Sequence, residues 1–265
     1  MSSELLDLAR RIAIEAGELA ALRRREGVEV AATKSSIVDV VTAADREVEE
    51  LIRRRIAEAR PQDAILGEEG GSTGGSSGVT CVVDPIDGTV NYLYGIPHYA
   101  ISIAVVEGEP DPLEWTALAG IVLNPASGEL FSAARGTGAF LGDEPIRVAA
   151  PAPLEQALVA TGFAYDAAMR GGQGEVVARL LPRVRDIRRN GTASLDLAFV
   201  ACGRLNAYYE RTLNPWDHGA GALIAEEAGA VVRGLGVARP SRDFLIAGHP
   251  DVVGPLEQLL VELGV

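Results

Sequence analysis

The sequence has few cysteines, few basic residues and no long hydrophobic run. Its two cysteines, Cys81 and Cys202, both stand in apolar surroundings, so we expect buried thiols in a reduced cytoplasmic protein and no disulfide. No apolar run approaches the roughly 18 residues of a membrane span, and the first residues lack the basic and apolar regions of a secretory signal. We therefore expect neither a membrane anchor nor secretion.

Basic residues are outnumbered. The chain has 24 lysines and arginines against 37 aspartates and glutamates, which gives a formal net charge of −13. A surface that follows nucleic-acid phosphates needs clustered Lys and Arg, so we expect no nucleic-acid partner. The acidity favours solubility, and it is compatible with a phosphorylated substrate where bound divalent cations invert the local field.

Several catalytic signatures are missing as well. The sequence has no Gly-x-Ser-x-Gly elbow and no Walker A loop, so nothing supports serine-hydrolase or nucleotide-kinase chemistry. The three histidines lack the spacing of a zinc site, and we place His98 in a turn and His249 in a loop. No repeat of about 20–50 residues is visible.

The first half of the chain predicts two helices followed by a sheet. Apolar residues recur at helical spacing over residues 3–25, and a capping box of Thr42 and Asp45 predicts a second helix that ends near Ala59. The glycine- and serine-rich residues 70–78 predict a flexible loop. Extended stretches are expected at 28–32 and 38–42, and an antiparallel meander at 99–106, 115–122 and 129–134.

The composition changes around residues 149–153, Ala-Ala-Pro-Ala-Pro. At 265 residues the chain can form one large domain or two closely joined halves, so we place a boundary between an N-terminal α+β subdomain (1–150) and a C-terminal α/β subdomain (151–265). The second half alternates strands and helices, which indicates a layered α/β or α+β architecture. The expected strands are 157–161, 184–188, 205–210, 230–232 and 244–247, and the expected helices are 174–181, 193–202, 215–228 and 251–263.

The most informative stretch is Asp84–Thr89, with the sequence DPIDGT, which follows the apolar strand 79–83. Pro85 interrupts the strand's hydrogen bonds and Gly88 permits a sharp turn, so two carboxylates, a carbonyl and a hydroxyl can face one space. These are hard oxygen ligands of the kind that Mg²⁺ prefers. A plain surface turn would use the same dipeptides, so further motifs have to decide.

Two more acidic motifs are present. Gly67–Gly70 (GEEG) precedes the first motif and Asn214–Gly219 (NPWDHG) lies far downstream. Together the three motifs resemble those of the inositol monophosphatase superfamily of Mg²⁺-dependent, lithium-sensitive phosphatases, over about residues 34–229 and in the family order. The resemblance implies an α+β fold, a layered α-β-α-β-α sandwich of the sugar-phosphatase type. It also implies a homodimer, two or three Mg²⁺ ions, and hydrolysis of inositol 1-phosphate to inositol and phosphate by a metal-activated water.

The same resemblance assigns roles to residues. Glu68 and Asp84 would hold one ion with the carbonyl of Ile86, and Asp84, Asp87 and Asp217 would hold the second. Thr89 and Asp45 would activate the water, with Glu68 as a third catalytic residue, although Asp45 is also a plain helix cap. The implied substrate contacts are Lys34, Asp87, Gly88, Thr89, Gly191, Thr192, Ala193, Glu210 and Asp217.

The metal motifs do not decide the substrate, because sister phosphatases share them. These act on fructose 1,6-bisphosphate, histidinol phosphate or 3′-phosphoadenosine 5′-phosphate. Glu210 and residues 92–97 favour the inositol branch, whereas the match weakens over residues 162–172. A catalytically silent regulatory module on the same fold is a further alternative. Loss of a metal carboxylate would favour that module, but all of them are retained.

Overall fold

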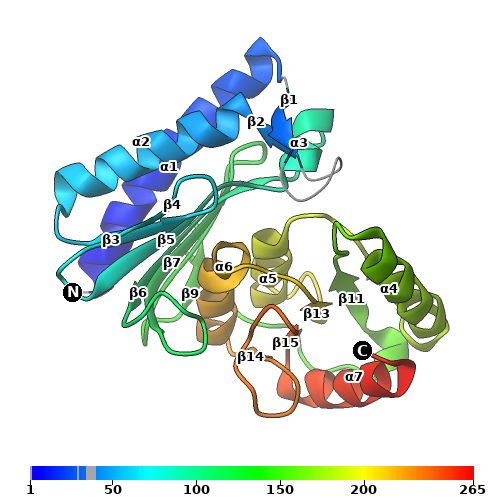
Figure 1. Cartoon of the computed structure of the whole chain (residues 1–265). Coiled ribbons are helices and arrows are strands. Elements are labelled where there is room, and N and C mark those ends of the chain that lie inside the picture. Colours follow the sequence, from blue (N-terminus) through cyan, green and yellow to red (C-terminus); the bar gives the residue numbers. More distant parts are fainter. Residues whose placement is uncertain (1, 29, 34–39) are drawn as a thin grey trace.

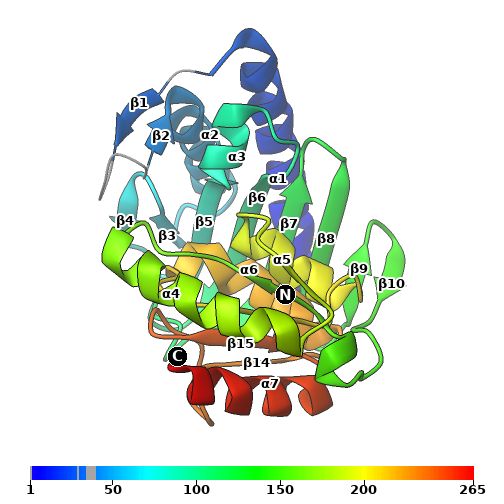
Figure 2. The same ribbon diagram turned by 90° about the vertical axis from the view of Figure 1, so that its right-hand side faces the viewer.

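The computed structural model describes residues 2–28, 30–33 and 40–265 and stacks helices and sheets in five layers (Figure 1). An eight-stranded sheet and a five-stranded sheet alternate with three helical layers, which confirms the predicted α-β-α-β-α sandwich. Figure 2 shows the last helical layer on the side of the molecule away from the first. The layers in order are α1 (Ser2–Glu26) with α2 (Ala43–Ala59), α5 (Ala193–Ala201) with α6 (Pro215–Glu227), and α4 (Ala167–Leu180) with α7 (Pro250–Leu263).

The large sheet contains the predicted meander and the first two acidic motifs. Its interior strand β5 is buried along its whole length and pairs in parallel with β3 and antiparallel with β6. Strands β7 and β8 extend the sheet beyond β6 in antiparallel pairs. In sheet order the strands are β10 (Glu144–Ile146), β9 (Ala139–Leu141), β8 (Glu129–Ala134), β7 (Thr116–Asn124), β6 (Ala100–Glu107), β5 (Val79–Asp87), β3 (Ala64–Gly67) and β4 (Gly71–Thr73).

The small sheet belongs to the second half of the chain. Strand β11 pairs in parallel with β12 and β13, and β15 pairs antiparallel with β13 and β14. Its strands in order are β12 (Asp186–Arg188), β11 (Leu158–Thr161), β13 (Ala207–Glu210), β15 (Leu245–Gly248) and β14 (Val231–Arg233). Strands β1 (Val30–Thr33) and β2 (Val40–Thr42) form a separate two-stranded antiparallel sheet. The remaining helical segments are α3 (Thr89–Tyr94), η1 (Leu154–Gln156) and η2 (Leu181–Arg183).

Helices α5 and α6 lie between the two sheets, and their apolar side chains form one core with both. Close packing there depends on glycine. A Cβ at Gly120 of β7 would lie 2.9 Å from the carbonyl oxygen of Ala220, and one at Gly221 would lie 2.8 Å from Cβ of Leu197. Two further cores lie under α1 and α2, and under α4 and α7.

The large sheet ends at Ile146 and the small one begins at Leu158, while the proposed division at residue 150 stays a prediction.

Parts of the secondary-structure prediction were wrong. Residues 71–73 of the expected flexible loop form β4, an exposed edge strand, because backbone pairing with β3 needs no apolar side chain. The helix expected at 174 begins at Ala167, where the Asp166 side chain accepts a hydrogen bond from the amide of Met169 at 2.8 Å. The hairpin of β9 and β10 was not predicted.

The structure also tests the predictions for the cysteines, His249 and the membrane span. Both cysteines are free, as expected, but only Cys81 is buried, whereas Cys202 is half-buried. His249 lies in the connection between β15 and α7, where a loop was predicted, and it is the N-cap of α7. Residues 34–39, which include part of the extended stretch expected at 38–42, lie outside the described residues. Among the described helices, none is long and apolar enough to cross a membrane.

Candidate active site

A cleft of about 520 Å³ opens where the end of β5 faces α5, α6 and the end of β13. All predicted site residues line it except Asp45, which lies behind Thr89, and Lys34, which lies outside the described residues. The cleft thus brings together residues from three distant motifs. The predicted residues in its lining are Glu68, Asp84, Ile86, Asp87, Gly88, Thr89, Gly191, Thr192, Ala193, Glu210 and Asp217.

Asp84 and Asp87 face the cleft because β5 bulges between them. Asp84 is paired with Ser102 and Asp87 with Ala100, so the β5 side holds one extra residue and the ladder is interrupted. The amide of Ile86 donates to Oδ1 of Asp84 at 3.1 Å, which fixes the first carboxylate against the bulge. The DPIDGT turn predicted from Pro85 and Gly88 is therefore a bulge followed directly by α3.

Glu68 and Asp217 reach the same space from other elements. Glu68 lies in the turn between β3 and β4, and its amide donates to the carbonyl of Val83 at 3.2 Å, one residue before Asp84. Asp217 lies in the first turn of α6, where the amide of Asn214 donates to its Oδ2 at 2.6 Å. That turn is tied to β6 by the Ser102 hydroxyl, which donates to the carbonyl of Trp216 at 3.3 Å.

The carboxylates of this cleft repel one another. Burial, followed by repulsion from Glu68, Asp87 and Asp217, holds the pKa of Asp84 well above its usual range. Burial and repulsion from Glu68 and Asp87 do the same to the pKa of Asp217. Burial also raises the pKa of Asp87 to about 7, although two hydrogen bonds from Ser194 oppose that rise. Such a cluster is relieved by a bound cation.

The donor set fits a hard divalent cation. Aspartate and glutamate oxygens and a backbone carbonyl are the ligands that Mg²⁺ and Ca²⁺ take. Asp84, Asp87 and Asp217 each accept a backbone amide on one oxygen, an arrangement in which a carboxylate can present its second oxygen to an ion. Within the ranges that the structure describes, no three acidic, histidine or cysteine side chains are already spaced to hold an ion.

Thr89 and Asp45 are in contact. The Thr89 hydroxyl lies 3.2 Å from Oδ1 of Asp45 and 3.1 Å from the carbonyl oxygen of Ile86, and it can donate its hydrogen bond to either atom. The other oxygen of Asp45 accepts the amide of Thr42 at 2.7 Å and its hydroxyl at 2.5 Å, which confirms the predicted capping box. Burial raises the pKa of Asp45 to about 6, so this carboxylate is more basic than an ordinary aspartate.

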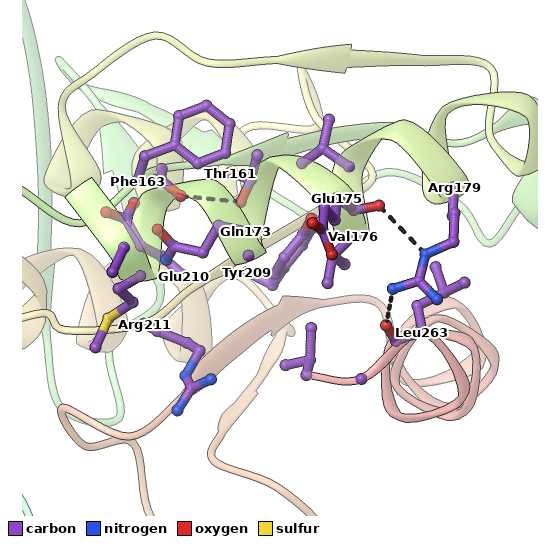
Figure 3. A pocket seen from close by; sticks show the side chains of 17 residues that line it. Thr161, Phe163, Gln173, Glu175, Val176, Arg179, Tyr209, Glu210, Arg211 and Leu263 are labelled. Atoms are coloured by element: carbon purple, nitrogen blue, oxygen red, sulfur yellow. Dashed lines mark hydrogen bonds between the residues drawn. The ribbon is translucent and has the colours of Figure 1, made fainter. Parts of the chain in front are cut away.

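Glu210 lies at the other end of the cleft. The Tyr208 hydroxyl donates to its Oε2 at 2.6 Å, and burial raises the pKa of Glu210 to about 7, against the opposing effects of Tyr208 and Arg189. The carboxylate packs on Gly162, where a Cβ would lie 1.9 Å from Oε2. Behind Glu210 lies a second cavity of about 360 Å³, between α4, β13 and the end of α7 (Figure 3).

Gly88 allows the first motif to meet the Gly191-Thr192-Ala193 segment. Gly88 has a φ of 91°, and a Cβ there would lie 2.5 Å from the hydroxyl oxygen of Thr192. The Asn91 side chain donates to the carbonyls of His98 and Asn190, at 2.8 and 2.7 Å. These bonds hold α3 against the segment that leads into α5.

Some residues of the site were missed by the sequence analysis. Ser194 donates both its amide, at 2.8 Å, and its hydroxyl, at 2.5 Å, to Oδ2 of Asp87. Its position directly after Gly191-Thr192-Ala193 was the available signal. Phe163, Arg189 and Arg242 line the cleft itself, and nothing in their sequence surroundings marks them.

Comparisons with known proteins agree on one family. The model of the inositol monophosphatase family matches residues 1–250. An inositol-1-monophosphatase of Mycobacterium leprae is 44% identical over 248 residues, which cover 87% of this chain and 83% of that protein. The Nus factor SuhB of Xylella fastidiosa is 41% identical over 241 residues, with 87% and 85% covered. The crystal structure of the extragenic suppressor protein suhB from Bartonella henselae superimposes with a TM-score of 0.90 at 34% identity, over 99% of this chain and 100% of that one.

Proposed function

The chain belongs to the inositol monophosphatase family and is a phosphatase, and we propose that it hydrolyses inositol 1-phosphate to inositol and phosphate with the help of Mg²⁺. One observation carries the proposal: four carboxylates, a hydroxyl with its own carboxylate partner and a distant glutamate converge on a single cleft. The name inositol-1-monophosphatase, given to the relative in Mycobacterium leprae, supports the choice of substrate.

Glu68, Asp84, Asp87, Asp217 and the carbonyl of Ile86 would hold the Mg²⁺ ions. When bound, two such ions clamp the phosphate, lower the pKa of an attacking water and stabilise the departing alkoxide. The protein supplies the negative charge that binds them and the hydrogen bonds that keep the carboxylates in place. Burial of these carboxylates keeps the local dielectric low, which strengthens their attraction for a cation.

Thr89 and Asp45 would accept the proton of the attacking water. The Thr89 hydroxyl can take that proton while passing its own to Oδ1 of Asp45, 3.2 Å away. The raised pKa of Asp45, about 6, suits this role because a general base works best when its pKa approaches the working pH. The two bonds from Thr42 hold the second oxygen of Asp45 and so orient the carboxylate.

The two ends of the substrate would meet different elements. The leading amides of α3, at Gly88 and Thr89, lie outside the helix's own bonds and suit a phosphate. Glu210 faces the same cleft from β13, where its carboxylate can accept hydrogen bonds from ring hydroxyls. Gly191, Thr192 and Ala193 would line the ring between these ends.

Other parts of the proposal rest on the family alone. Lithium sensitivity, a homodimer, a cytoplasmic location and a contact from Lys34 stay predictions. The sister substrates fructose 1,6-bisphosphate, histidinol phosphate and 3′-phosphoadenosine 5′-phosphate remain the alternatives, because the metal motifs serve all of them.

Phosphate release from a panel of esters tests the proposal. We expect inositol 1-phosphate to have the highest kcat/KM, with turnover that requires Mg²⁺ and stops when EDTA is added. Asp84→Asn should abolish turnover on every ester, because it removes charge from the carboxylate shared by both proposed ion positions. A sister ester that is preferred over inositol 1-phosphate would change the substrate. Asp84→Asn activity within about tenfold of the parent, or Mg²⁺-independent turnover, would contradict the metal sites.

A further inference from the structure

Glu49 is a buried carboxylate that none of the roles above uses. It lies on α2, one turn after Asp45, and its side chain is 2% exposed. A carboxylate shielded from water to this extent is costly unless other groups bond to it. The partners of Glu49 therefore show what it does in the fold.

The partners of Glu49 are two backbone amides of the turn after Glu68 and the side chain of Arg53, which also donates a hydrogen bond to the end of that turn. Oε2 of Glu49 accepts the amide of Glu69 at 2.7 Å, and Oε1 accepts the amide of Gly70 at 2.8 Å. The guanidinium of Arg53 donates to Oε1 at 2.7 Å and to the carbonyl of Gly71 at 2.5 Å. The carboxylate and its arginine thus bind the backbone of the β3–β4 turn at three successive residues.

The glycines of the GEEG motif make room for this carboxylate. A Cβ at Gly67 would lie 2.4 Å from Oε1 of Glu49, and a Cβ at Gly70 would lie 2.8 Å from the same atom. A side chain at either position would push Glu49 out of the turn. Glu68 stands between these glycines, with its own amide bonded to Val83 and the next amide bonded to Glu49.

We propose that Glu49 is a positioning residue that holds the Glu68 turn in place and so sets the affinity of the cleft for its divalent cation. The inference rests on the proposed function, in which Glu68 is an ion ligand. Because α2 also carries Asp45, which contacts Thr89, one rigid helix fixes both the Glu68 turn and the proposed base. Residues that orient metal ligands commonly contribute about 10–100-fold to metal affinity or activity.

The substitution Glu49→Gln tests this with the least change of shape. Both carboxylate oxygens of Glu49 accept N–H groups, so the glutamine amide nitrogen must face at least one donor and loses that bond. We expect Mg²⁺ binding, measured by titration calorimetry, to weaken on the order of tenfold or more. The Mg²⁺ concentration for half-maximal activity should rise in parallel, whereas kcat at saturating Mg²⁺ should fall much less.

Glu50→Gln is the matched control, because it makes the same charge change at the neighbouring, exposed position of α2. It should bind Mg²⁺ as the parent does. If the role of Glu49 is purely structural, Glu49→Gln will have a lower melting temperature but a Mg²⁺ affinity within about twofold of that of the parent and of Glu50→Gln. That result would overturn the inference.

Gly70→Ala is a second variant, and it decides the matter if Glu49→Gln does not fold. It keeps the carboxylate but places a methyl group 2.8 Å from Oε1 and 2.9 Å from Nε of Arg53, both on side chains that can move. Weaker Mg²⁺ binding supports the inference, and parent-like binding overturns it. A parent protein that binds no Mg²⁺ would refute the proposed function itself. A parent that binds Mg²⁺ and turns over, beside variants of unchanged affinity, would refute only the role of Glu49.

Discussion

Replacing Glu210 by glutamine keeps the shape of the side chain and removes its charge. The shape matters because the Glu210 carboxylate contacts Gly162 on one side and accepts the Tyr208 hydroxyl at 2.6 Å on the other, and a glutamine oxygen can keep that bond. If Glu210 accepts hydroxyls of the inositol ring, kcat/KM for inositol 1-phosphate falls in Glu210→Gln. The value for p-nitrophenyl phosphate, which has no ring hydroxyl, stays within about twofold of the parent.

The size of the loss follows from the charge. A hydrogen bond to an ionised group contributes roughly 1.5–3 kcal/mol, against about half that for a neutral one. Losing the charge at one or two ring hydroxyls therefore lowers kcat/KM on the order of 10–100-fold, since about 1.4 kcal/mol corresponds to tenfold. The assay compares both substrates at saturating Mg²⁺. Equal losses on the two substrates would refute ring recognition and make Glu210 a structural residue.

The same variant tests the electrostatics of Glu210. Its pKa is raised from 4.5 to about 7, so between those pH values the folded protein holds a proton that the unfolded chain has lost. Stability therefore falls as pH rises from 4.5 to 7, and the full cost is present above pH 7. At about 1.4 kcal/mol per pKa unit the ceiling is roughly 3 kcal/mol, and the open cleft reduces this to about 1–2 kcal/mol.

Without Mg²⁺, Glu210→Gln should therefore unfold at higher temperature than the parent at pH 8, and at a similar temperature at pH 4. Differential scanning calorimetry at the two pH values measures this. A variant that gains no stability at pH 8 would contradict the idea that ionised Glu210 is destabilising. A gain in stability together with a lower kcat/KM for inositol 1-phosphate is typical of a functional residue that destabilises the folded protein.

Two further substitutions test single hydrogen bonds. Thr89→Ala should lower kcat on the order of 10²–10⁴-fold, and Thr89→Ser should recover much of the lost rate. The Mg²⁺ affinity of both variants, measured by calorimetry, should be nearly unchanged. A phosphothreonine trapped at Thr89 would instead make Thr89 the nucleophile. Ser194→Ala removes the 2.5 Å hydroxyl bond to Asp87 but keeps the amide bond at 2.8 Å, so Mg²⁺ affinity should fall on the order of tenfold, and an unchanged affinity would show that the amide alone orients the carboxylate.

Features that depend on neighbours in the sequence were predicted well. The capping box of Thr42 and Asp45 is a local pattern, and the structure has it where it was expected. The strand that leads into Asp84 was recognised because an apolar run before a Pro and Gly turn leaves few alternatives, although β5 continues through a bulge to Asp87. The meander of β6, β7 and β8 followed from three successive apolar stretches.

Features that depend on backbone pairing or on capping by an isolated side chain were missed. Strand β4 has no apolar residue and is exposed, so only its pairing with β3 identifies it. The start of α4 depends on Asp166, a cap followed by residues of no clear helical period. The hairpin of β9 and β10 comprises two strands of three residues each, too short for a periodic signal.

The sequence by itself determined which chemical groups the protein has: the acidic motifs, their order and the turn residues that let them face one space. The tertiary structure decided which groups meet. Asp87 and Ser194 are separated by 107 residues, and their contact exists because α5 packs between the two sheets. Glu49 reaches the Glu68 turn because α2 covers the large sheet and two glycines leave room for a carboxylate. Contacts of this kind depend on how layers pack, and packing combines all the side chains of the core, so no local stretch of sequence encodes them.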